Sequence, residues 1–352
     1  MDSVRPEIAN ARTLPTEFYT DSCIYERAKD AAFAKSWQWI ADDNVVKIPG
    51  QVFPFTLLEG CLDEPLMLTR DKDDVVHCLS NVCTHRGNIL CEHAGTERAL
   101  RCRYHGRRFG LDGKFQHMPE FEEVEGFPSE ADNLPRVPFA KWGPFLFASL
   151  EPHVELVEWL APVSDRVLGI ELGSLQLDSS RSRDYLVNAN WALYVENYLE
   201  GFHVPFVHPS LNEVLDYGSY SQALFEGGNV QIAYGDDAIP GLGGEKGVAA
   251  LYFWLFPNLM LNFYPWGLSI NVVKPLGVDR TRISFVCYVS DPTRLGTGAG
   301  AELDRVERED EAIVETVQRG VRSRLYKHGR YSVKRETGLH QFHRILHKSL
   351  AH

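Results

Sequence analysis

The spacing of apolar residues changes twice along the chain. Residues 16–42 carry apolar side chains at helical spacing, which predicts a helix there. From residue 44 the pattern becomes short alternating segments separated by turn signals, which is typical of β-strands. Beyond residue 152, helical and strand patterns mix. The sequence therefore predicts an N-terminal helical part at 1–43, a β domain at 44–152 and a mixed domain at 153–352.

An uncharged stretch at residues 247–273 has the apolar content of a membrane segment but not its continuity. Pro257, Pro265 and Gly267 interrupt it, so the apolar helix of ~20 residues that a bilayer requires does not fit there. Short buried strands separated by turns fit better. The strands expected in and after this stretch are 249–256, 259–264, 268–274 and 281–290. A long amphipathic helix is predicted next, from residue 302 to about residue 326.

The composition is that of an ordinary globular protein. The 352 residues are 44% hydrophobic and 24% charged, which predicts about two folded domains. A formal net charge of −12 argues against nucleic-acid binding and against binding to an anionic membrane, because both require a basic surface. The first thirty residues lack the apolar run of a secretion signal, and the cysteines number seven. Reduced thiols or metal ligands in a cytoplasmic protein are therefore expected.

Two short loops each combine one thiol with one imidazole. Cys83 and His85 form the first loop, and Cys102 and His105 form the second, with sixteen residues between the two. A structural zinc site usually pairs Cys with Cys and His with His. The mixed loops instead favour a two-iron cluster, with both thiolates on one iron and both imidazoles on the other. A Cys₂His₂ zinc site is the alternative.

A second group of potential ligands lies around the end of a helix predicted at 190–203. Counting 100° per residue places Glu196, Glu200 and His203 on one face of that helix. His208 follows five residues after His203, in a non-helical exit segment. Two histidines at this spacing can reach one metal ion, and two structural histidines are the alternative. The spacing alone does not choose between Glu196 and Glu200 as the acid that accompanies them.

A third ligand can be sought as an acid in an apolar position. In the long amphipathic helix, Asp310 lies near the centre of the apolar stripe, whereas Glu309 and Glu311 point about 100° to either side. A carboxylate buried alone is costly, so Asp310 should pair with a lysine or arginine or bind a metal. The metal interpretation is a 2-His-1-carboxylate triad of His203, His208 and Asp310, which holds Fe(II) and leaves positions open for O₂.

Taken together, these motifs resemble the α subunits of Rieske non-haem iron oxygenases, the aromatic-ring-hydroxylating dioxygenase family, from about residue 13 to residue 342. The resemblance rests on Leu14-Pro-x-x-Phe-Tyr19, the two Cys/His loops, Glu196-Asn-Tyr-Leu-Glu-Gly-Phe-His203, Val207-His-Pro209, and Glu309-Asp310 with Val317-Gln-Arg-Gly320. Within the family, the sequence is more similar to the choline, carnitine and glycine-betaine monooxygenase branch. That similarity rests on Glu200 three residues before His203, on Gly329-Arg-Tyr-Ser332 and on Phe342-His-Arg344.

The resemblance implies an α+β fold, in which a small all-β Rieske domain is inserted into a helix-grip catalytic domain with an antiparallel sheet and long helices. It implies a [2Fe–2S] cluster on Cys83, His85, Cys102 and His105, and a mononuclear Fe(II) on His203, His208 and Asp310. It also implies a homotrimer that receives electrons from NAD(P)H through a separate flavin or iron–sulfur reductase and passes them across a subunit interface. Glu200 would bridge His105 of one chain to His203 of the next, with Asn197 close to the iron.

The activity implied by the resemblance is O₂-dependent hydroxylation of a small organic substrate, an N-methyl or quaternary-ammonium compound. Ring hydroxylation by a dioxygenase is the alternative. Remoter alternatives are an electron carrier that uses the Rieske centre alone and a zinc-stabilised binding module. Aromatic residues in or beside the uncharged strands are candidates for the substrate pocket, through cation–π attraction or stacking: Tyr252, Trp254, Phe263, Tyr264 and Trp266.

One residue departs from the family pattern. Arg107 stands where Rieske oxygenases usually carry a tryptophan, directly after the second His-Gly pair. We therefore expect an aromatic wall near the cluster to be missing, with the cluster ligands themselves unchanged.

Overall fold

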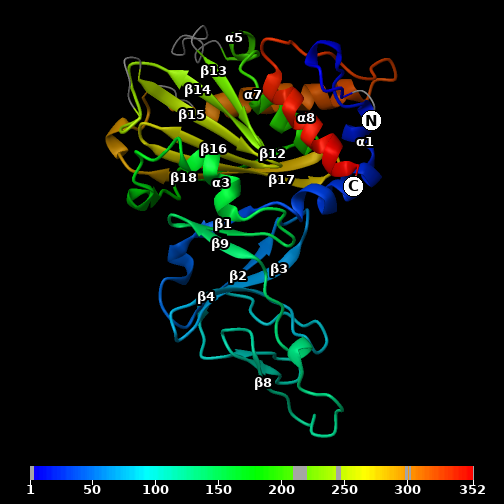
Figure 1. The fold of residues 1–352 in the computed structure, drawn as a ribbon, viewed down its shortest axis with the longest axis vertical. Coiled ribbons are helices and arrows are strands. Elements are labelled where there is room, and N and C mark those ends of the chain that lie inside the picture. The colour runs from blue at the N-terminus through cyan, green and yellow to red at the C-terminus, as the bar shows by residue number, and fades with distance from the viewer. Residues whose placement is uncertain (1–3, 209–219, 243–246, 298–299, 301–302, 352) are drawn as a thin grey trace. The chain divides into compact units, whose positions relative to one another are not determined.

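The chain forms two compact units (Figure 1). The computed structural model describes residues 4–208, 220–242, 247–297, 300 and 303–351. One unit comprises residues 1–33 and 157–352, and the other comprises residues 34–156, inserted between these two segments. The β domain predicted at 44–152 falls within the inserted unit. Within the described ranges, no helix is both long and apolar enough to cross a membrane.

The inserted unit is built mainly of short antiparallel strands. They are β1 (Gln38–Asp42), β2 (Gln51–Leu57), β3 (Glu64–Arg70), β4 (Val76–Ser80), β5 (Gly95–Thr96), β6 (Leu100–Arg101), β7 (Arg108–Phe109), β8 (Phe115–His117), β9 (Phe139–Trp142) and β10 (Phe145–Ala148). They form three sheets, with strand orders β1-β10-β9, β4-β3-β2-β5 and β6-β7-β8.

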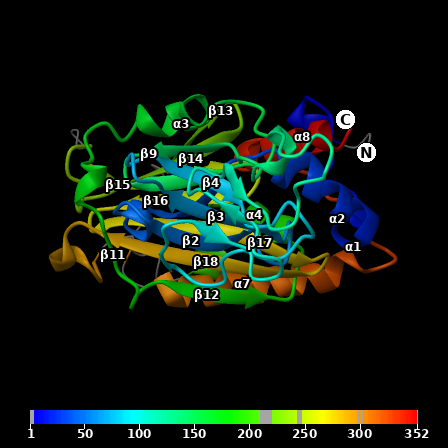
Figure 2. The same cartoon turned by 90° about the horizontal axis from the view of Figure 1, so that it is seen from below.

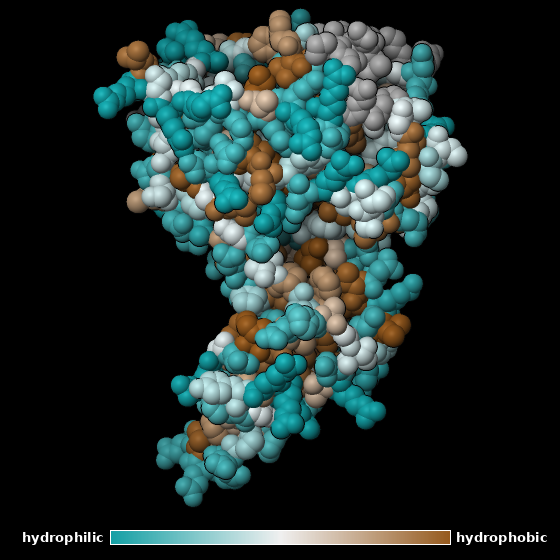
Figure 3. Space-filling view, turned by 180° about the vertical axis from the view of Figure 1, so that it is seen from behind, coloured by the Kyte–Doolittle hydropathy of each residue, from teal (hydrophilic) through white to brown (hydrophobic). Residues whose placement is uncertain are grey.

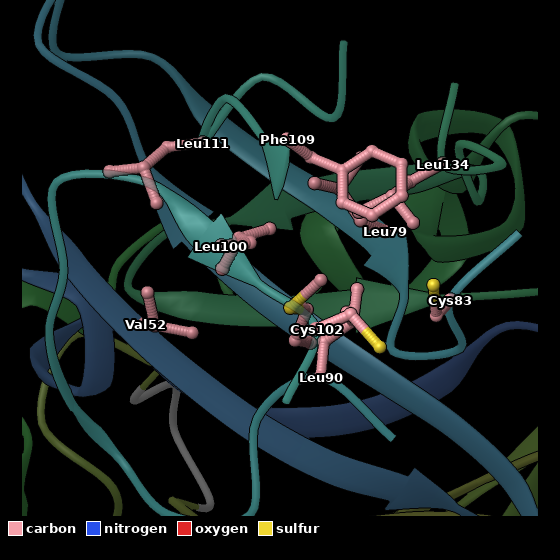
Figure 4. Close-up of a cluster of buried hydrophobic side chains, with 10 residues drawn as sticks. Val52, Leu79, Cys83, Leu90, Leu100, Cys102, Phe109, Leu111 and Leu134 are labelled. Atoms are coloured by element: carbon pink, nitrogen blue, oxygen red, sulfur yellow. The ribbon is translucent and has the colours of Figure 1, made fainter. Parts of the chain in front are cut away.

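Two apolar clusters make the core of the inserted unit. Because side chains alternate along a strand, Leu66 and Leu68 of β3 join one cluster while Met67 joins the other. The cluster that contains Met67 also holds Cys83 and Cys102, so the two predicted cluster cysteines are surrounded by buried apolar side chains (Figure 4).

The larger unit contains one antiparallel sheet of eight strands. They are β11 (Gln176–Leu177), β12 (Arg183–Val187), β13 (Ser221–Phe225), β14 (Gly228–Tyr234), β15 (Val248–Leu255), β16 (Leu259–Tyr264), β17 (Gly267–Gly277) and β18 (Arg280–Val289). Strands β13 to β18 pair in chain order, and β11 and β12 both pair with β18. The four strands predicted between residues 249 and 290 are confirmed to within three residues at each end.

The two faces of this sheet differ in polarity. One row of paired residues across β14 to β18 is apolar: Val230, Phe253, Leu261, Ile270 and Val286. The adjacent row, on the opposite face, is largely polar: Gln231, Tyr252, Asn262, Ser269 and Cys287. A register slip of one residue would exchange these faces, so the alternation fixes which side carries polar groups.

Helices pack on the polar face of the sheet. The α-helices of the described residues are α1 (Thr16–Thr20), α2 (Ser22–Ala28), α3 (Leu156–Ser164), α4 (Trp191–Tyr198), α5 (Val204–Val207), α7 (Leu303–Val321) and α8 (Thr337–Leu350). In Figure 2 the long helix α7 runs alongside the strands of this sheet. Helix α4 packs on β17 and α7, and α8 packs on β13 and β14. The hydroxyl of Tyr198 in α4 donates to the Asn262 carbonyl oxygen at 2.5 Å, which places the polar row beneath the helices. The predicted α+β arrangement is therefore confirmed.

Three of the predicted helices are wrong at their C-terminal ends. The helix expected from residue 302 to about residue 326 stops at Val321. The helix expected at 16–42 stops by residue 33, and Gln38–Asp42 forms β1 because it pairs with β10. The helix expected at 190–203 stops at Tyr198. Beyond it, the Glu200 carboxylate accepts the backbone N–H of His203 at 3.1 Å, a local bond that competes with continued helix.

Candidate functional site

The two ligand loops of the inserted unit fold as matched turns. In each, the cysteine N–H donates to the carbonyl five residues later at 2.8 Å, and the glycine four residues later donates back to the cysteine carbonyl at 3.0 Å. Gly87 and Gly106 fill these positions with φ of +71° and +76°, which residues with a Cβ adopt at a cost. Both turns therefore present Cys83 and Cys102 in the same way, each with a histidine between cysteine and glycine.

The four predicted cluster ligands fit a metal group. Cys83 and Cys102 are each 2% exposed, and the rings of His85 and His105 lie with their centroids 4.8 Å apart. Burial raises the pKa of the Cys83 thiol, as does the neighbouring Cys102, against the opposing backbone N–H of His85. A thiolate there needs a positive partner such as iron. The His105 Nδ1 atom is buried with no hydrogen-bond partner, which fits a metal ligand.

Arg107 is a buried cation next to the second loop. It is 2% exposed, and its guanidinium carbon lies 5.0 to 5.6 Å from the ring centroids of Phe109, Phe115 and Phe127. Its Nη2 atom bonds the Asp132 carboxylate at 2.7 Å. Although burial opposes the change, this bond lowers the pKa of Asp132. The expectation of a missing aromatic wall is thus corrected, because three phenylalanine rings surround the guanidinium.

The backbone carbonyl of Asp132 connects the two ligand loops. It accepts one hydrogen bond from Arg107 Nη2 at 3.0 Å and another from Thr84 Oγ1 at 2.9 Å. Thr84 belongs to the first loop, and Arg107 directly follows the second. Arg107 therefore helps to hold together the two loops that carry the predicted cluster ligands.

A separate group of ligands gathers in the larger unit. The Nε2 atoms of His203 and His208 lie 3.5 Å and 3.0 Å from Asp310 Oδ1. One ligand atom from each of the three residues lies within 4.8 Å of the others, and elsewhere in the described part of the chain no three His, Cys, Asp or Glu residues gather in this way. Two imidazoles and one carboxylate form the donor set of an Fe(II) facial triad.

A carboxylate orients each histidine of the triad. His203 Nδ1 lies 2.7 Å from Glu200 Oε1, and His208 Nδ1 lies 2.7 Å from Glu309 Oε2. The hydrogen bond from His208 lowers the pKa of Glu309, so this carboxyl group is ionised. An imidazole that donates from Nδ1 presents its Nε2 lone pair, so both rings offer Nε2 to the same point.

One short helix sets the distance between the two histidines. His203 is the N-cap and His208 the C-cap of α5, which spans Val204–Val207. Asp310 comes from α7, which packs against α4, so the triad combines the segment after α4 with the helix beside it. Pro209, part of the histidine motif, lies outside the described residues.

The structure distinguishes the two glutamates that the sequence left open. Glu200 bonds His203, whereas Glu196 accepts a hydrogen bond from the Tyr19 hydroxyl at 2.7 Å and pairs with His343 Nε2 at 3.0 Å. Since α4 ends before residue 200, the two acids do not share a helical face. Glu196 therefore connects α4 to both terminal segments of the chain and lies outside the triad.

A cavity of about 130 Å³ lies beside the triad within the larger unit. Its wall includes the triad together with Asn197 and Glu200, the two other predicted catalytic residues. Five tyrosines also line it: Tyr194, Tyr198, Tyr220, Tyr252 and Tyr264. Among the described residues of its wall there is no lysine or arginine, and Glu307 is an additional acid.

Of the five predicted pocket aromatics, only Tyr252 and Tyr264 line this cavity in the described structure. Trp254 is buried against Phe342 with ring centroids 5.2 Å apart, where α8 packs. Phe263 alternates with Tyr264 along β16 and so faces the other side of the sheet. Trp266 stacks behind Tyr264 at 5.0 Å and lines a different cavity. The prediction that Trp254, Phe263 and Trp266 line the pocket beside the triad is therefore corrected.

Two acids of α7 were missed by sequence reasoning. Two apolar residues of α7, Ile313 and Val317, are 40% and 41% exposed, whereas the polar residues Glu307 and Gln318 are buried. The buried face of α7 is thus rotated towards Glu307. Glu307, Val314 and Val321 lie seven residues apart and are all buried. A search for helical periodicity that included polar as well as apolar residues would therefore have placed Glu307 on the buried face. No local pattern marks Glu309, since its partner His208 lies 101 residues away.

Comparisons with known proteins agree with this geometry. Residues 174–352 match the family described as the ring hydroxylating alpha subunit (catalytic domain), and residues 36–128 match the Rieske [2Fe–2S] domain. The chain is 32% identical over 365 residues to the chloroplastic choline monooxygenase of Arabidopsis thaliana, covering 97% of this chain and 84% of that protein. It is 29% identical over 356 residues to the carnitine monooxygenase oxygenase subunit of Escherichia coli (strain K12), covering 96% and 93%.

A solved structure shows the same fold. The crystal structure of a quaternary ammonium Rieske monooxygenase in complex with L-carnitine matches this chain with a TM-score of 0.76 at 24% identity. The match covers 97% of this chain and 95% of that chain.

Replacing Arg107 with alanine should release the two ligand loops. The R107A variant loses the bonds to Asp132, so we expect at least half of the [2Fe–2S] absorbance per chain to be lost. The stability of the inserted unit should fall by about 3 kcal/mol, the cost of breaking a buried pair. R108Q, which changes the exposed neighbour of Arg107, serves as control. Visible absorbance and iron and sulfide content measure the effect, and a fully loaded R107A protein would contradict the positioning role.

Replacing Glu309 with alanine should weaken iron binding at the triad and leave the cluster intact. Without Glu309, nothing holds the His208 proton on Nδ1, and loss of such an outer partner costs about 10- to 100-fold in metal affinity. Iron titration of the apoprotein measures this change. E315A, on the same helix but bonded to Asn188, is the matched control. Equal iron affinities of E309A and E315A would refute the orienting role.

Proposed function

The chain belongs to the family of Rieske oxygenases with a ring-hydroxylating α subunit, and we propose that it is the terminal oxygenase that hydroxylates a quaternary-ammonium or N-methyl compound with O₂. The observation that carries this substrate class is the cavity beside the triad, which joins tyrosine rings to acidic groups and has no lysine or arginine among its described residues. Tyrosine faces attract a quaternary ammonium, and acidic walls favour a cation. The relatives named choline and carnitine monooxygenases support the same class.

In this proposal the two metal groups are divided between the units. Cys83, His85, Cys102 and His105 would hold the [2Fe–2S] cluster, and His203, His208 and Asp310 would hold Fe(II). When bound, these groups supply single-electron transfer and O₂ activation, which amino-acid side chains lack.

The protein's own part is to orient and to enclose. Glu200 and Glu309 keep protons on the Nδ1 atoms of the histidines and so direct both Nε2 atoms inward. His208 is 1% exposed, so water reaches this side of the triad poorly. The Asn197 amide lines the cavity, where it can bond a polar group of the substrate. The target methyl group is thereby held beside the metal site.

Electron transfer would run between chains of a homotrimer. Glu200, which bonds the ligand His203, is followed by the exposed rings of Phe202 and Phe206, 42% and 79% accessible. In the inserted unit, the ring of Tyr104 is 55% exposed and stacks on His105. Exposed rings beside each of these sites favour a protein–protein contact there. The face in Figure 3 is mostly hydrophilic, with apolar side chains in scattered patches. A head-to-tail contact closes into a ring of three when successive subunits are related by a rotation of one third of a turn.

The electrons would come from NAD(P)H through a separate flavin or iron–sulfur reductase, as is typical of the family. We place the protein in the cytoplasm, because its seven cysteines are all unpaired, which fits a reducing compartment.

Turnover tests the proposed function directly. With a surrogate reductase and NADH, the protein should consume O₂ with choline, carnitine or glycine betaine and not with aromatic hydrocarbons. Loss of a methyl group would release formaldehyde. H203A should keep the cluster absorbance and lose at least 100-fold in turnover, because it lacks a triad ligand. Oxidation of aromatic compounds alone would favour the dioxygenase alternative. A loaded protein that oxidises no compound would favour an electron carrier.

Mixed oligomers test transfer between chains. C102S removes a cluster ligand and H203A removes a triad ligand, so each homo-oligomer should be inactive. If electrons cross a subunit interface, oligomers refolded or co-expressed from both variants should recover a substantial fraction of wild-type turnover. Mass photometry or sedimentation would give the number of chains. Inactive mixed oligomers that contain both metal groups would exclude the inter-chain route.

A further inference from the structure

Glu307 is a buried carboxyl group in the cavity wall that the triad does not use. It is 5% exposed and lies three residues before Asp310 on α7. In the described structure its hydrogen-bond partner is the Tyr194 hydroxyl, which lies 2.9 Å and 2.7 Å from its two oxygens. One hydroxyl carries one proton, so it cannot satisfy both oxygens fully.

The charge of Glu307 has no compensation within the described part of the protein. No lysine, arginine or histidine there pairs with it, and its neighbour Asp310 is also an acid. Burial raises the pKa of Glu307 well above its usual range, and Asp310 raises it further. An isolated buried carboxylate is costly, so the raised pKa favours the neutral carboxyl group when no cation is bound. An entering positive group would favour the ionised form and pair with it.

The residues around Glu307 fit a positive group that donates no hydrogen bonds. Glu307 and Tyr194 enter the cavity from the helices, whereas Tyr252 and Tyr264 enter it from the sheet, with ring centroids 5.8 Å apart. A trimethylammonium group spreads its charge over methyl groups, so it gains from ring faces and from a carboxylate without needing directed bonds. A neutral substrate of the same shape leaves Glu307 without its counter-charge.

We propose that Glu307, held by Tyr194, is the specificity-determining residue that recognises the positive charge of the substrate. The inference rests on the proposed function and deepens it. Glu307 would select a cation over a neutral molecule of equal volume, while the triad residues act on the metal.

The test compares each cation with its carbon isostere. Choline is paired with 3,3-dimethylbutan-1-ol, and glycine betaine with 3,3-dimethylbutanoate, since in each pair a carbon replaces the charged nitrogen. Anaerobic calorimetry on the iron-loaded wild-type protein should show at least tenfold tighter binding of the cation in one pair. E307Q, which keeps shape and removes charge, should reduce that preference at least tenfold by weakening the cation and sparing the isostere. Y194F should also reduce the preference for the cation, but by a smaller factor than E307Q.

Controls separate charge recognition from damage to the fold. E311Q changes another acid of α7 that does not line the cavity, and it should keep the wild-type preference. Iron content and melting temperature identify variants that have lost the site. If E307Q is one of them, the preference for the cation is measured on Y194F instead. A wild-type preference that survives in folded, iron-loaded E307Q overturns this inference alone. Equal wild-type affinity for cation and isostere also overturns it. A wild-type protein that oxidises no quaternary-ammonium compound overturns the proposed function together with the inference.

Discussion

An imidazole ligates a metal through a nitrogen that carries no proton, so a protein must fix the proton on the other nitrogen of each ligating histidine. Here Glu200, in the turn after α4, fixes it for His203, and Glu309 on α7 fixes it for His208. This requirement sets the end of α4, the single turn of α5 and the register of α7. Asp310 follows Glu309 directly, so one turn of α7 supplies both a ligand and an orienting group.

The two units treat buried charge in opposite ways. In the inserted unit, Arg107 is paired with Asp132 and enclosed by phenylalanine rings, so its positive charge is neutralised within the fold. In the larger unit, Glu307 is held by one hydroxyl and faces a cavity. A charge with an internal partner stabilises geometry, whereas a charge without one remains available to a ligand. The same distinction separates Glu196, which joins the terminal segments, from Glu307.

Sequence spacing was sufficient where the determinants are local. The strands between residues 249 and 290 were expected from short apolar segments separated by turn residues, and the structure gathers the histidines and Asp310 that their spacing had singled out. Sequence spacing was insufficient where a side-chain contact determines the structure or the role of a residue. The C-terminal end of α4 depends on the Glu200 side chain, and the role of Glu309 depends on a histidine 101 residues away. Trp254 shares its sheet face with Tyr252, yet α8 covers it.

The larger unit is assembled from both ends of the chain, and this has a consequence for biosynthesis. The inserted unit is complete once residue 156 has left the ribosome, and domains fold as units when they emerge. Tyr19, made early, must then wait for Glu196, and Glu196 must wait for His343, nine residues from the last. The inserted unit can therefore fold during translation, while the contacts of Glu196 in the larger unit are complete only once residue 343 has been made. The order of the segments along the chain thus gives folding a built-in order, with the inserted unit before the larger one.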